Sequence, residues 1–208
     1  MTNKRRLAIL GASGHGKVCA DIAEQLDYRV EFFDDRSQTL GTRIELWPLV
    51  GDTQTLIDRV DDFDAVFIAV GNNQARRKLY KRFSELDIEL ASLISPAAVV
   101  SSYASVAEGV VVMPNAVINA YAKVGMGAIV NTAAVVEHDC VIQACAHISP
   151  NAALAGGVAL GECAWLGIGA CAKQLINIGN NSVVGAGAVV VKDVADNLIV
   201  VGNPAQVK

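Results

Sequence analysis

The chain contains three histidines, His15, His138 and His147, and imidazole is the side chain best suited to accept a proton near neutral pH. His138 stands between two carboxylates, Glu137 and Asp139. A carboxylate that binds one ring nitrogen of an imidazole fixes its tautomer and stabilises the protonated ring. The residues at 137 to 139 therefore have the composition of a general base with a supporting acid.

A metal site and a covalent mechanism have less support from the residue types. A catalytic zinc needs about three convergent ligands such as histidine, and His15 lies in the other half of the chain from His138 and His147. The five cysteines contain no C-x-x-C pair, and Cys140 occupies a small, inward position of the repeat described below. We expect no metal and no thiol nucleophile.

A glycine-rich turn at 11–16, Gly-Ala-Ser-Gly-His-Gly, follows an apolar run at 6–10 and precedes a helical pattern at 17–26. Such a turn between a strand and a helix brings backbone N–H groups to an anionic ligand. Its spacing, G-x-x-G-x-G, differs from the dinucleotide fingerprint G-x-G-x-x-G, and Val18 stands where a Walker A motif has Ser or Thr. The turn suits a phosphate-bearing ligand and argues against an ATPase.

The first half of the chain alternates strand and helix patterns. We expect further strands at 28–33 and 65–70 and helices at 53–59 and 75–83, which together predict a Rossmann-like parallel sheet with ligands at the carboxyl ends of its strands. Asp34 and Asp35 follow the second of these strands, where an acidic residue can accept hydrogen bonds from a ribose or a base. A solvated turn is the alternative for both residues.

The second half repeats every six residues. Each sixth residue from Ile94 to Val190 is apolar, and the position four further on is nearly always Ala, Cys or Ser. One bulky and one small inward residue per hexad is what a narrow, three-sided solenoid requires, with 18 residues in each coil. We expect a left-handed parallel β-helix of hexapeptide repeats over 96–208, after an α/β domain at 1–95.

Composition excludes several classes of function. The chain has 208 residues, 52% of them hydrophobic, and a formal net charge of -4, so it must bury a core and does not have a surface suited to nucleic acid or anionic lipid. Residues 96–208 contain no arginine. The apolar run near the N-terminus is too short for a signal peptide or a membrane span, and the odd number of cysteines is typical of reduced proteins. We expect a cytoplasmic protein with no membrane partner.

Taken together, the two halves resemble bacterial nucleotide-aminosugar N-acetyltransferases of the bacillosamine pathway, to which sialic acid O-acetyltransferases are related. The resemblance is carried by the glycine turn, Asp34-Asp35, Val70-Gly-Asn-Asn73, the run 136–142, His147, and the closing Val-Gly-Asn-Pro-Ala at 201–205. It implies transfer of acetyl from acetyl-CoA to the 4-amino group of a UDP-linked 4-amino-4,6-dideoxy sugar. It also implies that the nucleotide part binds to the first domain.

The resemblance assigns roles residue by residue. His138 matches the base and Asp139 a neighbouring carboxylate, although side chains that are adjacent on a strand point to opposite faces, so Glu137 remains a rival unless a corner bends the chain at 139. Residues that match the nucleotide-sugar site are Ser13, Gly14, His15, Asp34, Asp35 and Gly71. Residues that match the acetyl-CoA site are Asn131, His147, Gly156, Ile168 and Ala186.

The repeat supplies an independent check, because residues 18 apart stack on adjacent coils about 4.8 Å apart. This places Gly156 beside His138, where the missing side chain leaves room for a thioester and a backbone N–H for its oxygen. It also stacks His147 on Trp165. A prism this narrow has no deep pocket, so we expect a homotrimer with sites between subunits.

Two alternatives stay open at this stage. The first is related chemistry, namely O-acetylation of sialic acid or acetylation of another nucleotide amino sugar. The second is a different class, a protein that binds NAD or another nucleotide without acetyl transfer, against which the missing G-x-G-x-x-G spacing argues.

Overall fold

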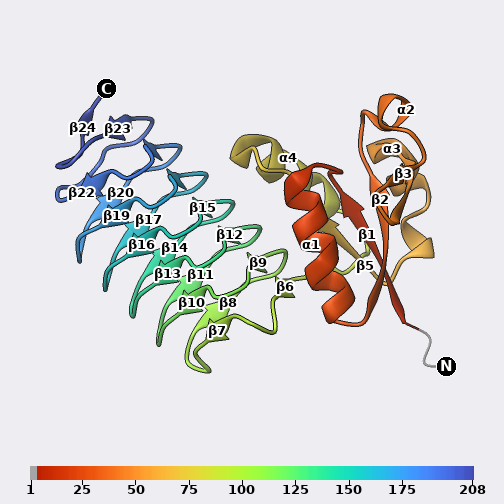
Figure 1. The fold of residues 1–208 in the computed structure, drawn as a ribbon, viewed down its shortest axis with the longest axis horizontal. Helices are drawn as coiled ribbons and strands as arrows, with labels where there is room; N and C mark the ends of the chain where they lie inside the picture. Colours follow the sequence, from red (N-terminus) through yellow and green to blue (C-terminus); the bar gives the residue numbers. More distant parts are fainter. Residues whose placement is uncertain (1–3) are drawn as a thin grey trace. The chain divides into compact units, whose positions relative to one another are not determined.

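The computed structural model describes residues 4–208, which divide after Pro96 into two compact units. The first unit is an α/β domain and the second is a coil of short strands (Figure 1).

The sheet of the first unit has the strand order β3-β4-β2-β1-β5. Its strands are β1 (Arg5–Leu10), β2 (Tyr28–Phe33), β3 (Arg43–Ile44), β4 (Trp47–Gly51) and β5 (Ala65–Ile68). β1 pairs in parallel with β2 and β5, and β3 pairs antiparallel with β4. The run 7–10 of β1 is almost fully buried, as expected for a parallel strand covered by helices.

The helices of the first unit are α1 (Gly14–Gln25), α2 (Ser37–Leu40), α3 (Thr53–Asp58) and α4 (Asn73–Phe83), with a 3₁₀ turn at Val60–Asp62. Asp52 caps α3 by accepting a hydrogen bond from the Thr55 N–H at 2.8 Å, and Asn72 caps α4 by accepting one from the Ala75 N–H at 2.9 Å. These caps fix where each helix begins after its strand.

The sequence prediction for this unit was right in outline and wrong in detail. The strand at 28–33 is confirmed, but the strand predicted at 65–70 ends at Ile68, and β3 and β4 were missed. α1 begins at Gly14, before the predicted Lys17, because Ser13 is its N-cap and two low-propensity glycines, Gly14 and Gly16, form its first turn. Similarly, α4 begins two residues before the predicted Ala75.

The second unit is the predicted left-handed parallel β-helix, built from three sheets of short strands. The first sheet contains β7 (Val99–Val100), β10 (Val117–Ile118), β13 (Val135–Val136), β16 (Ala153–Leu154), β19 (Cys171–Ala172) and β22 (Val189–Val190). The second contains β8 (Ser105–Val106), β11 (Lys123–Val124), β14 (Val141–Ile142), β17 (Ala159–Leu160) and β20 (Asn177–Ile178). The third contains β9 (Val111–Val112), β12 (Ile129–Val130), β15 (His147–Ile148), β18 (Trp165–Leu166), β21 (Val183–Val184), β23 (Ile199–Val201) and β24 (Gln206–Val207). The short strand β6 (Leu93–Ile94) precedes the division after Pro96.

The strand register confirms the 18-residue coil. Val117 pairs with Val135 and then Val135 with Ala153, so each residue lies over the one 18 positions away. From Val112 to Val190, the apolar residue of each hexad is buried. Every sixth residue from 109 to 187 has a positive φ, so the chain turns each corner through a left-handed residue.

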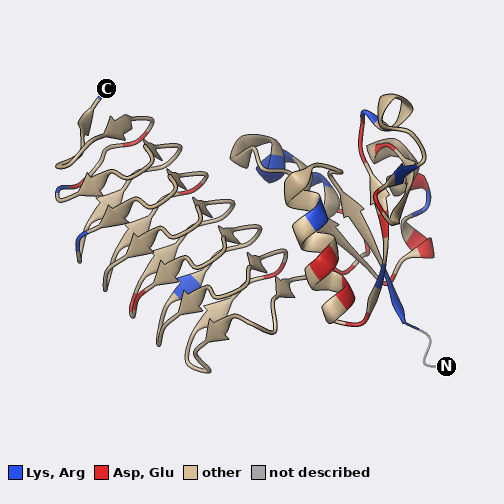
Figure 2. Cartoon of the chain, viewed as in Figure 1, with Lys and Arg blue, Asp and Glu red and all other residues tan. Residues whose placement is uncertain are grey.

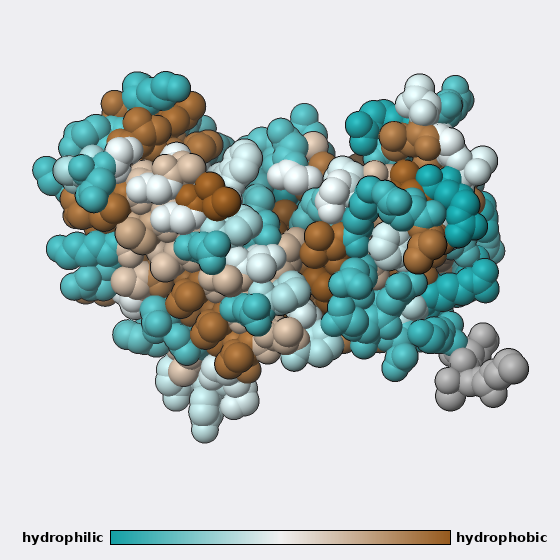
Figure 3. Space-filling model, in the orientation of Figure 1, coloured by the Kyte–Doolittle hydropathy of each residue, from teal (hydrophilic) through white to brown (hydrophobic). Residues whose placement is uncertain are grey.

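Surface chemistry differs between the two units. Charged side chains are dense on the first unit and sparse on the β-helix (Figure 2). Figure 3 shows apolar atoms at the surface of the coils instead. Side chains that contribute to this apolar surface are Val99, Tyr103, Tyr121, Ile168 and Leu175, all more than half exposed.

Candidate active site

A corner of the β-helix holds the His138–Asp139 pair. Asp139 has φ 60°, and this left-handed conformation breaks the usual alternation of side chains along a strand. Its Oδ2 atom lies 2.8 Å from Nδ1 of His138. Because a carboxylate only accepts, Nδ1 carries the proton and Nε2 of the neutral ring is left as a proton acceptor.

The carboxylate of Glu137 is engaged elsewhere. Its Oε2 atom accepts a hydrogen bond of 2.9 Å from Nδ2 of Asn119, which stands 18 residues earlier on the adjacent coil. Of the two carboxylates considered from the sequence, Asp139 is therefore the one that binds His138 in this structure.

Gly156 lies directly beside the His138 ring. A Cβ atom placed on Gly156 would lie 2.6 Å from both Cε1 and Nε2 of His138 and would contact no backbone at that distance. The two coils are joined there by a hydrogen bond of 2.9 Å from the Gly157 N–H to the His138 carbonyl. The 18-residue period predicts this neighbour. The His138 ring packs against residue 156 in the space that a side chain there would occupy.

Two exposed apolar side chains lie on the coils next to this corner. Tyr121 precedes Asp139 by 18 residues, and its ring packs against Tyr103 with centroids 5.7 Å apart. Leu175 follows Gly157 by 18 residues and leans over it, since a Cβ on Gly157 would lie 2.8 Å from Leu175 Cδ2. The sequence analysis did not single out Tyr121 or Leu175, although the repeat period would have found both.

A second cluster lies on the third sheet. The rings of His147 and Trp165 stack 5.5 Å apart at an angle of 7°, as their spacing of 18 predicts. Asn131 accepts from the Thr132 N–H through Oδ1 at 2.8 Å, which turns its amide nitrogen towards Nε2 of His147 at 3.0 Å. His147 is thereby held as the tautomer protonated on Nδ1.

This cluster opens into an apolar groove of about 420 Å³. The residues that line it include His147, Ile168 and Ala186, which the resemblance assigns to the acetyl-CoA site, and Trp165, which stacks on His147. Ser149 also lines it and accepts a hydrogen bond of 2.7 Å from the Trp165 indole N–H. A groove with this lining suits an extended, largely apolar ligand arm.

The two clusters occupy different corners of the prism. His138 and Gly156 lie between the first and second sheets, whereas Ile168 and Ala186 lie between the third and first. One flat side of the coil, spanning about 16 Å, therefore separates them within a single chain.

In the first unit, the predicted glycine turn leads into α1. Ser13 is exposed, Gly14 and His15 begin the helix, and the first-turn N–H groups have no carbonyl of an earlier helical turn to bind. A pocket of about 300 Å³ beside the turn is lined in part by Gly11, Asp35 and Val70. Gly71 is the residue after Val70, and a Cβ atom placed on Gly71 would meet no other atom within 4 Å.

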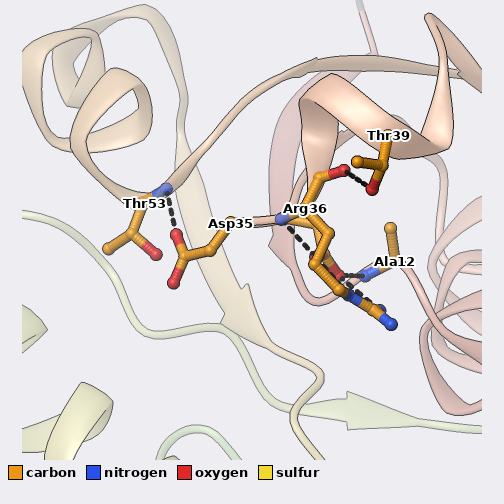
Figure 4. Close-up of polar contacts among 6 residues, drawn as sticks. Ala12, Asp35, Arg36, Thr39 and Thr53 are labelled. Atoms are coloured by element: carbon orange, nitrogen blue, oxygen red, sulfur yellow. Dashed lines mark hydrogen bonds and ion pairs between the residues drawn. The ribbon is translucent and has the colours of Figure 1, made fainter.

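Asp34 and Asp35 are both held by the protein itself (Figure 4). Asp34 accepts hydrogen bonds from the Ala12 N–H at 2.9 Å, from the Arg36 N–H at 2.9 Å, and from the Arg36 guanidinium at 3.1 and 3.3 Å. Asp35 accepts one from the Thr53 N–H at 3.0 Å. Asp35 is exposed and keeps one carboxylate oxygen available, whereas Asp34 is buried.

Two arginines of this unit escaped the sequence analysis. Arg76 on α4 is fully buried, and its guanidinium donates to the carbonyls of Val70 and Gly71 at 2.8 and 3.2 Å. Arg76 thus fixes the loop that carries Gly71. No pattern in the sequence of helix 73–83 indicates that one of its arginines is buried. The second residue, Arg36, is the ion-pair partner of Asp34.

His15 is neutral over a wide pH range. Burial, together with a smaller effect of the positive charge of Arg76, lowers the pKa of His15 to about 4. Its Nε2 atom lies 3.8 Å from Sγ of Cys19. His15 can therefore present a neutral imidazole, not a cation, at the glycine turn.

This shift makes stability depend on pH. Because folding lowers the pKa of His15, the unfolded chain binds the proton more tightly than the folded chain. The contribution of His15 to the unfolding free energy is therefore fully present above about pH 6.5 and is lost as the pH falls towards 4. We expect His15→Gln to remove about 2.5 kcal/mol of the fall in unfolding free energy between pH 7 and pH 4.5. Urea titrations of both proteins at the two pH values measure it, and equal falls would refute the shift.

Comparisons with known proteins agree with both units. Residues 6–83 match the family model of the PglD N-terminal domain. The chain is 37% identical over 111 residues to the UDP-N-acetylbacillosamine N-acetyltransferase of Bacillus subtilis (strain 168), an alignment that covers 52% of the chain and 51% of that relative. The match thus spans about half the length of the curated relative.

Solved structures match over nearly the whole chain. The acetyltransferase domain of PglB from Neisseria gonorrhoeae FA1090 is 41% identical, with a TM-score of 0.94 over 98% of this chain and 100% of that one, and it has also been solved in complex with acetyl coenzyme A. PerB from Caulobacter crescentus, in complex with CoA and GDP-perosamine, is 37% identical, with a TM-score of 0.93 over 100% of this chain and 98% of that one.

Metal-binding clusters and membrane-spanning helices are both absent from residues 4–208. Among residues 4–208, no group of three or more His, Cys, Asp or Glu side chains is arranged to hold a metal ion. No helix in the same range combines the length and the apolar character that crossing a membrane requires.

Proposed function

Since the chain belongs to the nucleotide-aminosugar N-acetyltransferase family, we propose that it transfers acetyl from acetyl-CoA to the 4-amino group of a UDP-linked 4-amino-4,6-dideoxy sugar. The observation that carries this proposal is the pair His138–Asp139 packed against Gly156. That corner offers a proton acceptor, a partner that sets its tautomer, and a neighbouring glycine that adds no side chain beside the acceptor nitrogen.

The proposed chemistry needs no covalent enzyme intermediate. The sugar amine attacks the thioester carbonyl, and Nε2 of His138 takes the proton that the amine loses. The oxyanion that forms lies near the Gly156 N–H. When the C–S bond breaks, His138 returns the proton to the CoA sulfur, so the base is regenerated.

Cys140 is a poor nucleophile in this structure. Its Sγ atom is buried and lies 3.2 Å from the Ala155 carbonyl, to which it donates. Burial raises the pKa of the Cys140 thiol, which keeps it protonated near neutral pH. Direct transfer therefore fits the chain better than an acetyl-cysteine route.

The groove on the third sheet is the proposed site of the CoA arm. Ile168 and Ala186 give it an apolar floor, and His147 and Trp165 give it one rigid wall. Relatives of this family have been solved with acetyl coenzyme A or CoA bound.

A homotrimer follows as a proposal from the distance between the two corners. The base and the groove lie at different corners of one prism, and apolar side chains are exposed along its coils (Figure 3). Packing three prisms side by side would bring the groove of one copy to the base of the next and cover part of this apolar surface. Sedimentation velocity measures the oligomeric state. A protein that is monomeric at the assay concentration and still active would refute active sites shared between subunits.

The nucleotide part of the acceptor is assigned to the first unit, with Ser13, Gly14, His15, Asp35 and Gly71 as its contacts. The turn of α1 offers N–H groups to a phosphate, and Asp35 offers a carboxylate oxygen. A GDP-linked 4-amino sugar is the second candidate acceptor, because PerB, which matches along the whole chain, was solved with GDP-perosamine. A cytoplasmic location remains a prediction.

The acceptor is identified by measuring thiol release from acetyl-CoA with a panel of sugars. The panel contains UDP- and GDP-linked 4-amino sugars, a free sialic acid, and UDP-N-acetylglucosamine, which has no free amine. We expect release only with the 4-amino sugars and fastest release with the UDP-linked one. Release with sialic acid alone would replace N-acetylation by O-acetylation, and NADH binding without any release would indicate the non-transferase class.

Trp165 gives a direct test of the groove. The chain has two tryptophans, so in a Trp47→Phe variant the emission comes from Trp165 alone. We expect acetyl-CoA to change this emission with a saturation midpoint close to its KM. Trp165→Ala should raise the KM for acetyl-CoA about tenfold by removing the stack and the groove wall, and leave the KM for the sugar unchanged.

The Trp47→Phe protein is the control for this experiment, and its kcat should equal that of the unmodified chain. An emission that stays constant up to saturating acetyl-CoA would place the CoA arm elsewhere. So would a Trp165→Ala protein whose two KM values rise together.

A further inference from the structure

The Asp34 carboxylate has no hydrogen-bonding capacity left for a ligand. A carboxylate offers about four acceptor positions, two on each oxygen. Oδ1 accepts from the backbone N–H and the Nε–H of Arg36, and Oδ2 accepts from the Ala12 N–H and from Nη2 of Arg36. The role that the sequence suggested for Asp34, direct contact with a ribose or base, is therefore blocked in this arrangement.

The Arg36 side chain, by contrast, has donors to spare. A guanidinium carries five N–H groups, and the pair with Asp34 uses one on Nε and one on Nη2. Three N–H groups remain. The side chain is 64% exposed, yet it is held by a carboxylate that is itself fixed to the glycine turn through Ala12.

This arrangement places the guanidinium beside the glycine turn. Oδ2 of Asp34 bonds both the Ala12 N–H, at 2.9 Å, and Nη2 of Arg36, at 3.3 Å, so the two donors are neighbours (Figure 4). Ala12 leads into Ser13, the N-cap of α1, whose first-turn N–H groups face an anionic ligand in sites of this kind.

The charges around the pocket require a cation there. Asp34 and Asp35 both line it, and a nucleoside diphosphate brings further negative charge. In the described part of the chain, Arg36 is the only basic residue among those that line this pocket. Lys17 on α1 is paired with Glu45, and His15 is uncharged at neutral pH.

We infer that Arg36 is a diphosphate-binding residue of the nucleotide-sugar site, and that its pair with Asp34 both aims the guanidinium and cancels the charge that would repel the ligand. This inference rests on the proposed function, because it assumes that a nucleotide diphosphate enters this pocket. It changes the role of Asp34 from a ligand contact to a positioning residue.

The alternative is that Arg36 only stabilises the turn after β2. The backbone already holds that turn, since the Ser37 N–H donates to the Asp34 carbonyl at 2.8 Å and the Arg36 N–H donates to the Asp34 carboxylate. Both bonds survive when the side chain is changed. Arg36→Met should therefore fold like the unmodified chain, which thermal unfolding checks.

The test compares two ligands that differ only in phosphate, UDP and uridine. Affinities are measured by calorimetry, or for uridine by competition against UDP, on the unmodified chain, Arg36→Met and Arg36→Lys. We expect Arg36→Met to lower the affinity for UDP at least tenfold and the affinity for uridine less than twofold. Arg36→Lys should recover part of the lost UDP affinity, since a lysine keeps the charge without the forked geometry of a guanidinium.

Arg59→Met is the matched control. Arg59 pairs with Asp62 at 2.9 Å, so this change also removes one positive charge from an ion pair of the same unit, but Arg59 does not line the pocket. Its UDP affinity should equal that of the unmodified chain. A similar loss in both variants would show a long-range charge effect and overturn the inference.

Other outcomes separate the inference from the function on which it rests. Equal weakening of UDP and uridine by Arg36→Met would make Arg36 structural, and unchanged UDP affinity would exclude a phosphate contact. In either case acetyl transfer to a UDP sugar by the unmodified chain would leave the proposed function standing. An unmodified chain that binds neither UDP nor GDP and releases no CoA would overturn both.

Discussion

Replacing His138 with alanine is expected to lower kcat by about a thousandfold, within the range that loss of a general base produces. The reason is geometric as well as chemical, because Nε2 lies on the side of the ring next to Gly156 and Asp139 holds the proton on the other nitrogen. The affinity for acetyl-CoA should change less than twofold, since the groove on the third sheet is untouched. Single-turnover acetyl transfer and acetyl-CoA titration of the same samples measure the two quantities.

Two further readouts separate loss of the base from general damage. The residual rate of His138→Ala should rise with pH up to the pKa of the sugar amine, because without a base only the free amine reacts. Added imidazole should restore part of the rate by entering the space that the side chain leaves. A variant with unchanged turnover would remove His138 from the mechanism, and a low rate without rescue or pH dependence would indicate altered structure.

The sequence predicted which residues are neighbours on the β-helix, because register in this fold follows from counting. An 18-residue coil places Gly156 beside His138 and Trp165 on His147, and both neighbours are present in the structure. The choice between Glu137 and Asp139 could not be settled in that way. It depends on the left-handed corner at Asp139 and on Asn119, which binds Glu137, and neither follows from the apolar period.

The first unit was harder to predict because its site depends on which side chains form hydrogen bonds with one another. Asp34 lies at the predicted strand end, but its acceptors are taken by Ala12 and Arg36. β3 and β4 were missed because β3 has only two residues and β4 contains a proline at 48, so both have little strand signal. The only feature of the sequence that points to Arg36 is its place two positions after Asp34, the acidic residue at the end of the strand.

The second large effect is expected from Gly156→Ala. The new Cβ would lie 2.6 Å from Cε1 and Nε2 of His138, closer than such contacts allow, so the ring must turn away from the position in which Asp139 holds it. We expect kcat/KM for acetyl-CoA to fall about a hundredfold, as misplacement of a catalytic group by about 1 Å commonly causes. The UDP affinity of the first unit should not change, which calorimetry checks.

A double-mutant cycle decides whether Gly156 acts through the base. If the alanine works mainly by moving the His138 ring, it should cost less than tenfold in a chain that already carries His138→Ala, because there is no ring left to displace. A hundredfold loss in both backgrounds would mean that residue 156 acts on the thioester independently of His138. A folding defect is distinguishable, because it would lower the unfolding temperature and the activity together, whereas residue 156 meets only the movable side chain of His138 at close range.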